Sequence, residues 1–161
     1  MTKRTPARVP DAEVRQLQAS VQTFVRSFGL LVTKQTPCGQ PVSPSYAHAL
    51  MLLLERERLG ATTTHWELAE HLGLDKSSVA RLCARLQSEE HASQERAPDD
   101  GRSRRVELTA RGKRMATNLH AASLERFRRV VEAVPAAKRK TLLESLELLG
   151  AAVATLGEDP A

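Results

Sequence analysis

Two short predicted helices joined by a glycine turn constrain this chain more than any other feature. Thr64 and Glu67 have the spacing of a capping box, in which the two side chains satisfy backbone N–H groups at the start of a helix. Gly73 is suited to end that helix, and Asp75 is a favourable N-cap for a second one, from about Lys76 to Ser88. Two helices in this spacing predict a helix-turn-helix.

The second helix is predicted to have one buried stripe and one polar, basic face. Apolar residues recur at i, i+3, i+4 and i+7, and these are Val79, Leu82, Cys83 and Leu86. We interpret Cys83 as a core residue, because an uncharged cysteine behaves as a small hydrophobe. The opposite face holds the candidate DNA-binding residues of this helix, which are Lys76, Ser77, Ser78, Arg81 and Arg85. The two serines and Arg81 are the candidates for base edges, and Lys76 and Arg85 for phosphates, since a recognition helix offers its N-terminal residues to bases.

A basic hairpin is predicted to follow this helix. Its arms are Ala92–Arg96 and Arg104–Leu108, and the second arm alternates apolar and polar residues with the period of a half-buried strand. The tip at 97–101 has the composition of a turn. A basic hairpin beside a recognition helix is a wing that can reach phosphates or the minor groove. Thr62 and Thr63 are expected to form a short third strand that completes the small sheet.

The stretch resembles the winged helix-turn-helix of the MarR family of bacterial transcription regulators. The motifs that carry the resemblance are L-A-x-x-L-G-L at Leu68–Leu74, S-x-x-R-L at Ser78–Leu82, D-G-R-S at Asp100–Ser103 and L-T-x-x-G at Leu108–Gly112. The chain departs from the family pattern between the recognition helix and the wing. The family usually has glycine and an apolar pair there, whereas this chain has Glu90, His91 and Ala92. This departure bears on how the first wing strand packs.

The resemblance implies roles for the wing residues and for the assembly. Arg102 matches the family's wing-tip arginine and is expected in the minor groove, where Asp100 would orient it by a salt bridge. The other predicted wing contacts are Ser103, Arg104 and Arg105. The resemblance also implies a two-fold dimer whose terminal helices interlock and which reads a pseudo-palindromic operator. A small, often aromatic or phenolic, effector would bind between the dimer helices and the winged segment.

Helices are also predicted on both sides of the winged segment. An amphipathic helix runs from Asp11 to about Thr33, and a largely buried one, capped by Ser43, runs from Pro44 to about Leu59. Thr109 is expected to cap a long helix to about Val134. The last helix is predicted at 136–156.

The expected architecture is therefore mainly α-helical with a small β-hairpin wing. We expect one MarR-like domain over 1–161, with a winged helix-turn-helix core at 44–109 and dimerisation helices at 11–35 and 110–157.

Composition and motifs narrow the function. The formal net charge of +5 and the pI of about 9.7 suit a polyanionic partner. No apolar run approaches the roughly 20 residues that cross a bilayer, and no signal-peptide pattern is present, so a cytoplasmic location without membrane contact is expected. No metal-binding, phosphate-binding or nucleophile motif of usual spacing appears, so we expect no metal site, no cofactor and no catalytic site.

Two further questions stay open at the level of sequence. Cys38, in a loop rich in proline and glycine, is either a redox sensor or an ordinary loop cysteine. For the whole chain, the favoured interpretation is a sequence-specific regulator of transcription that binds double-stranded DNA and acts as a ligand-responsive, homodimeric repressor. The alternative is a winged-helix module that binds protein instead of DNA, because a fold alone does not determine a function.

Overall fold

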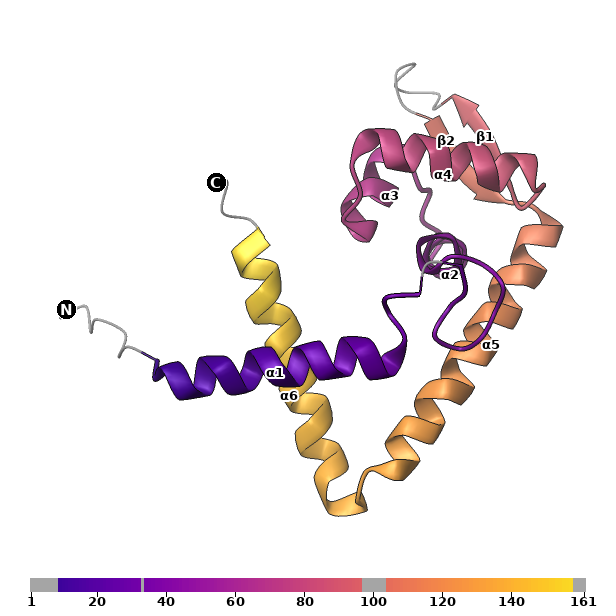
Figure 1. The fold of residues 1–161 in the computed structure, drawn as a ribbon. Helices are drawn as coiled ribbons and strands as arrows, with labels where there is room; N and C mark the ends of the chain where they lie inside the picture. Colours follow the sequence, from indigo (N-terminus) through magenta and orange to yellow (C-terminus); the bar gives the residue numbers. More distant parts are fainter. Residues whose placement is uncertain (1–8, 33, 97–103, 158–161) are drawn as a thin grey trace. The chain divides into compact units, whose positions relative to one another are not determined.

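The computed structural model describes residues 9–32, 34–96 and 104–157, and Figure 1 labels the elements in this part of the chain. In chain order they are α1 (Asp11–Phe28), α2 (Pro44–Arg58), α3 (His65–Leu72), α4 (Lys76–Ser88), β1 (Ala92–Arg96), β2 (Arg104–Leu108), α5 (Ala110–Ala133) and α6 (Ala136–Gly157). The predicted class, mainly helical with a hairpin wing, is confirmed. The chain divides into two compact units, Met1–Ala122 and Ser123–Ala161, and α5 begins in the first and ends in the second.

The start of α3 is held by the predicted capping box. The Thr64 hydroxyl accepts a hydrogen bond from the Glu67 N–H, and the Glu67 carboxylate accepts one from the Thr64 N–H at 2.7 Å. The Arg56 guanidinium on α2 donates to the same carboxylate at 2.6 Å, which ties α2 to the start of α3. Gly73 ends α3 in the left-handed region, with φ of 61°. The helix-turn-helix is therefore joined to α2 by side chains as well as by the backbone.

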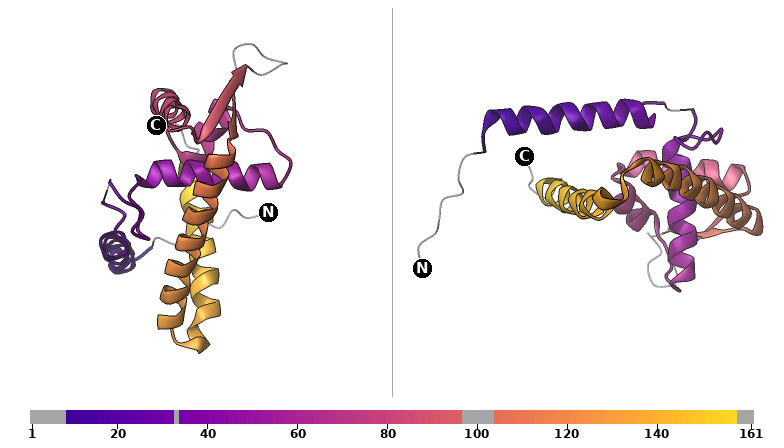
Figure 2. Two further views of the ribbon diagram at one scale, coloured as in Figure 1. Left: turned by 90° about the vertical axis from the view of Figure 1, so that its right-hand side faces the viewer. Right: turned by 90° about the horizontal axis from the view of Figure 1, so that it is seen from below.

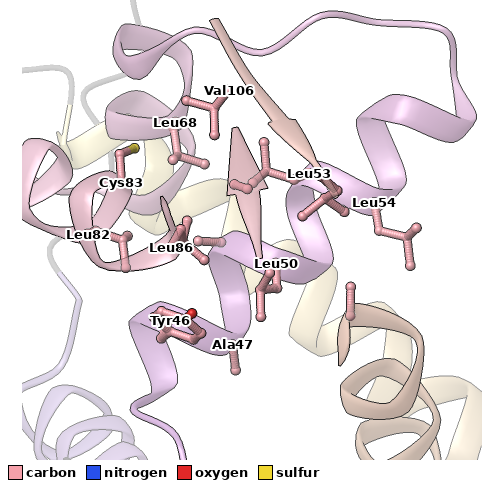
Figure 3. Packing of buried hydrophobic residues seen from close by; sticks show 14 of the residues in the cluster. Tyr46, Ala47, Leu50, Leu53, Leu54, Leu68, Leu82, Cys83, Leu86 and Val106 are labelled. Carbon is pink, nitrogen blue, oxygen red and sulfur yellow. The ribbon is translucent and has the colours of Figure 1, made fainter. Parts of the chain in front are cut away.

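The core of the first unit lies where α2, α3, α4 and the hairpin meet. The predicted stripe of α4 is buried in full, and α2 contributes most of the facing side chains. Figure 3 shows Leu50, Leu86 and Leu68 directed into the space between these helices and the hairpin. Ala116 and Leu119 on the first part of α5 are buried too. Most of the protein's buried apolar area in the described residues thus supports the helix-turn-helix and its hairpin.

The hairpin has the predicted arms but lacks the predicted third strand. Ala92 pairs with Leu108 and Arg96 with Arg104 in an antiparallel register, and the alternate residues Val106 and Leu108 are buried. Instead of a strand at Thr62 and Thr63, a single bridge joins Thr64 to Arg105. The expectation was wrong because Thr64 is already the N-cap of α3, so the chain turns into the helix after one bridge.

The segment between α4 and β1, where the sequence departs from the family pattern, is tightly held. Glu90 adopts a positive φ of 59°, a conformation that glycine adopts without strain. The His91 ring nitrogen Nδ1 lies 2.7 Å from the hydroxyl of the buried Tyr46, and the His91 carbonyl accepts the Thr109 N–H. The first wing strand is therefore anchored to α2 and to the start of α5, and its first residue, Ala92, is buried.

The N-terminal helix α1 is shorter than predicted and buries none of its residues. It ends at Phe28 because Gly29 takes a left-handed conformation, with φ of 83°. The predicted end of this helix near Thr33 was therefore too late, and the dimerisation role of 11–35 stays a prediction. Figure 2 shows α1 as one straight helix. Its exposed apolar side chains are Val14, Leu17, Val21 and Phe24.

One predicted cap is also wrong. Ser43 occupies the N-cap position of α2, but its side chain caps no backbone N–H group. Its hydroxyl lies 3.4 Å from the Ser45 hydroxyl instead. Pro44 stands at the first helical position, which suits proline because an N–H there would have no partner within the helix. Thr109 does cap α5, since its hydroxyl accepts the Gly112 N–H at 3.0 Å.

The second unit consists of the end of α5 and the helix α6. The Arg139 guanidinium donates to the carbonyls of Val134 and Glu132, which satisfies carbonyl groups at the end of α5. The exposed apolar residues of α6 are Leu143, Leu146, Leu148, Val153 and Leu156. In the described part of the chain, no helix is long and apolar enough to cross a membrane.

Candidate nucleic-acid interface

The exposed start of α4 is organised by the carboxylate of Asp75. One carboxylate oxygen accepts the N–H groups of Ser77 and Ser78 at 2.9 Å each, as expected of an N-cap. The two serine hydroxyls also donate to this carboxylate, at 2.6 Å each. Hydrogen bonds from these hydroxyls hold the pKa of Asp75 well below its usual range. The serine hydrogens are therefore directed inward, and the serine oxygens remain available as acceptors.

Arg81 lies one turn further along the same face. Its guanidinium donates to the Ser78 hydroxyl at 3.1 Å, so Asp75, Ser78 and Arg81 form a continuous chain of hydrogen bonds. Lys76 and Ser77 are exposed beside them. Four of the five predicted recognition-helix residues are thus close together on the N-terminal half of α4.

The fifth residue, Arg85, is placed differently. Its guanidinium carbon lies over the Tyr46 ring, 4.8 Å from the ring centroid. A cation in this position is attracted by the face of the aromatic ring. Arg85 therefore rests against α2, although it remains exposed. The sequence pattern of α4 alone does not indicate this contact, because Tyr46 lies far away along the chain.

The predicted wing residues fall partly outside the described structure. Asp100, Arg102 and Ser103 lie outside the described residues, so their proposed roles stay predictions. Arg104 is exposed at the start of β2. Arg105 is partly buried, and its guanidinium lies 3.8 Å from the Glu107 carboxylate.

A groove of about 680 Å³ lies between α3, α4 and the hairpin. Its apolar wall consists of Trp66, Ala69, Val79, Ala80 and Ala84, and its polar residues are His65, Lys76, Gln87, Gln94 and Arg104. None of these lining residues is acidic, so the groove carries a positive charge. Trp66 is 69% exposed, and sequence reasoning missed it because its exposure depends on how α3 packs. The one available signal was that it is the only tryptophan in the chain.

The floor of this groove is held by the Gln94 side chain. Its amide nitrogen donates to the Cys83 carbonyl at 3.1 Å and to the Gln87 side-chain oxygen at 2.7 Å. Its amide oxygen lies 2.8 Å from Nε2 of His65, which must therefore carry the hydrogen. β1, α4 and α3 are thus connected through a single side chain.

The two cysteines lie in different environments. Cys83 is fully buried, and burial raises the pKa of its thiol to about 11, which agrees with its interpretation as a core residue. Cys38 is partly exposed, with its sulfur 3.0 Å from the Thr36 hydroxyl. Within the described ranges, no group of three or more histidine, cysteine, aspartate and glutamate residues is arranged to hold a metal ion.

A second hollow, of about 470 Å³, lies between α2, α3 and the first part of α5. It is lined by His48 and Arg58 from α2, His71 from α3 and His120 from α5, together with apolar side chains of α2. Among the described residues that line it, Glu55 is the one acidic side chain. This concentration of cationic and histidine groups suits an acidic or phenolic molecule.

Comparisons with known proteins agree with the resemblance seen in the sequence. Residues 40–103 match the family model described as MarR family. A search of the curated proteins found no match. Among solved structures, the chain is similar to a probable transcriptional regulator from Pseudomonas aeruginosa, with a TM-score of 0.68, 21% identity, and coverage of 83% of this chain and 96% of that one.

Two further structures share the fold. The PcaV transcriptional regulator from Streptomyces coelicolor, in complex with its natural ligand, has a TM-score of 0.56 and 21% identity, and the match covers 95% of this chain and 99% of that one. The S. aureus MepR–DNA complex has a TM-score of 0.62 and 13% identity, with coverage of 91% and 99%. At these identities the likeness establishes the fold, and the predicted winged helix-turn-helix is confirmed.

Proposed function

We propose that this chain, whose residues 40–103 match the MarR family model, is a homodimeric, sequence-specific regulator of transcription that binds double-stranded DNA. The observation that carries the proposal is the exposed N-terminal half of α4. There Asp75 holds Ser77, Ser78 and Arg81 in place beside a basic hairpin. Side chains that are already ordered lose less conformational freedom when they bind.

The proposed contacts divide between bases and phosphates. Arg81 has free guanidinium donors for a base edge in the major groove, where arginine pairs with guanine. The Ser77 oxygen can accept a hydrogen bond from a base amino group, because its own hydrogen goes to Asp75. Lys76 and Arg85 are proposed for phosphates, and Arg102, with Ser103 and Arg104, for the wing contact. MepR, which shares the fold, has been solved in complex with DNA.

Dimer formation is proposed from the apolar surface that the described chain leaves uncovered. Val14, Leu17, Val21 and Phe24 lie on α1, which buries none of its own residues, and further exposed apolar residues lie on α6. Covering apolar area stabilises association by roughly 25 cal/mol per Å². A two-fold dimer would carry two copies of α4 to half-sites about one turn apart, and the protein would act as a repressor by occupying that operator.

An effector site is proposed in the hollow between α2, α3 and α5. Its histidines and Arg58 suit the acidic or phenolic group of a small aromatic ligand. PcaV, which shares the fold, has been solved with its natural ligand. A ligand there would release DNA only if it binds one spacing of the two α4 helices more tightly than the other.

The test is fluorescence anisotropy with a labelled duplex selected by the protein from a randomised pool, and with a scrambled duplex of equal length. We expect tight, strongly salt-dependent binding to the selected duplex only, with two protomers per site. Arg81→Ala should lose about 1–3 kcal/mol of discrimination at one base position. Equal and weak binding to both duplexes would refute the proposed function.

A further inference from the structure

We infer that the groove between α3, α4 and the hairpin binds the sugar–phosphate strand that separates the major groove from the adjacent minor groove, with Trp66 and Lys76 as its phosphate contacts. This inference rests on the proposed function, because it requires α4 to lie in the major groove. It adds a tryptophan on α3 to the DNA-binding surface.

The first step is geometric. The two grooves of a duplex are bounded by the same two backbones, so a single sugar–phosphate strand separates a major groove from the minor groove beside it. If α4 enters the major groove and the hairpin reaches the adjacent minor groove, that strand must cross the surface between them. On the protein, this surface is the groove lined by α3, α4 and the hairpin.

The second step is chemical, and it depends on the residues that line the groove. The indole N–H of Trp66 is a hydrogen-bond donor with no acceptor function, which suits a phosphate oxygen. Lys76 and Arg104 supply positive charge, and none of the lining residues in the described part of the chain is acidic. Ala80 and Ala84 keep the α4 wall low and apolar, which leaves room for deoxyribose carbons.

The third step concerns order before binding. Gln94 is bonded to the Cys83 carbonyl, to Gln87 and to His65, so the three elements around the groove are connected without DNA. Gln87 uses its amide oxygen in this network, and its amide nitrogen is a further donor for the strand. Trp66, 69% exposed, is the large apolar group on this surface that a backbone strand would cover.

The experiment replaces single phosphates of a selected duplex with neutral methylphosphonates, one position at a time, and measures affinity by anisotropy. For the wild type, we expect about a tenfold loss at one or two adjacent positions between the major-groove half-site and the flanking minor groove, because each loses a hydrogen bond to a charged group. Trp66→Phe removes the indole N–H and keeps an aromatic ring. In that variant the methylphosphonate at the phosphate bound by the indole should cost less than about twofold, whereas one at a phosphate bound by Lys76 should keep its cost.

Two further measurements keep the contacts distinct. Lys76→Ala should lower the salt dependence of binding by about one phosphate contact. Because Trp66 is the only tryptophan, quenching by acrylamide reports on it alone, and the selected duplex should protect it. Leu59→Ala is the matched control, since Leu59 is an exposed apolar residue at the end of α2, is 77% exposed and does not line the groove.

The possible outcomes separate this inference from the proposed function. Specific DNA binding with the same methylphosphonate profile in the wild type and in Trp66→Phe would overturn the inference and leave the proposed function standing. Absence of specific binding by the wild type would overturn both. Protection of Trp66 by benzoate and not by the selected duplex would assign the groove to a small aromatic anion and would also overturn the inference.

Discussion

Gly112, in the first turn of α5, occupies a position where no side chain fits. A Cβ atom added there would lie 1.8 Å from the His91 carbonyl oxygen and 2.8 Å from the carbonyl carbon. These are backbone atoms, so they cannot rotate away. The His91 backbone is held by its N–H bond to the Leu86 carbonyl at 2.8 Å and by the Thr109 N–H at 3.1 Å. Gly112→Ala must therefore displace either the start of α5 or the segment before the wing.

The size of the effect follows from three contributions. Overpacking of this kind costs about 1–3 kcal/mol. Loss or distortion of the hydrogen bond from Thr109 to His91 costs about 1 kcal/mol more. Alanine in place of glycine favours a helix by about 1 kcal/mol, which offsets part of the loss. The expected net decrease in the free energy of unfolding is about 1–3 kcal/mol.

Urea denaturation, followed by circular dichroism at a fixed protein concentration, measures this change. We expect a lower midpoint with an unchanged slope, because the variant alters stability and not the surface exposed on unfolding. Gly150→Ala on α6 is the matched control, since nothing lies within 4 Å of its added Cβ, and it should raise stability by about 0.5–1 kcal/mol. A Gly112→Ala protein as stable as the wild type would refute the steric argument.

Three further predictions concern pH and reactivity. Burial lowers the pKa of His91 below its ordinary value of about 6.5, so on acidification the unfolded chain binds a proton before the folded protein does. The free energy of unfolding should therefore fall as pH decreases through that value. Urea titrations at several pH values should show a weaker pH dependence of this free energy in His91→Asn. Because Cys83 is buried, iodoacetamide at neutral pH should alkylate only Cys38 in the native protein, and it should alkylate no cysteine in Cys38→Ser. Fast labelling of Cys83 would contradict this. Hydrogen bonds from the two serines that follow it lower the pKa of Asp75, so the stability this carboxylate contributes is complete above the ordinary aspartate pKa and lost as pH falls through the lowered one. The difference in thermal stability between the wild type and Asp75→Asn should therefore narrow in acid, and a constant difference would count against the capping role.

The helix-turn-helix and the hairpin arms were predictable because local interactions determine them. The capping box at Thr64 and Glu67, the left-handed Gly73 and the N-cap Asp75 each act within a few residues, so the sequence indicates where α3 and α4 begin and end. The buried stripe of α4 was predictable for the same reason, since helical periodicity places its apolar residues on one side. The third strand was not, because it depends on where β2 passes the start of α3.

Side-chain contacts between residues that are far apart in the sequence could not be predicted. Glu90 has a left-handed backbone conformation next to His91, and the His91 ring contacts the Tyr46 hydroxyl on α2. No residue near His91 in the sequence indicates this contact. The position of Arg85 over Tyr46 has the same origin. The groove that includes Trp66 forms where α3, α4 and the hairpin pack together around one core, and Gln94 connects them by hydrogen bonds.

By itself, the sequence determined the two helices and the two hairpin arms of the winged segment and which polar residues stand on the outer face of α4, because caps and periodicity act over one or two helical turns. Only the tertiary structure decided which exposed groups share a surface. Packing of α3 and the hairpin against α4 leaves Trp66 uncovered beside Lys76, and packing of the α5 start against His91 leaves no room for a side chain at Gly112. These outcomes depend on the distance between elements that are remote along the chain, which no local pattern specifies.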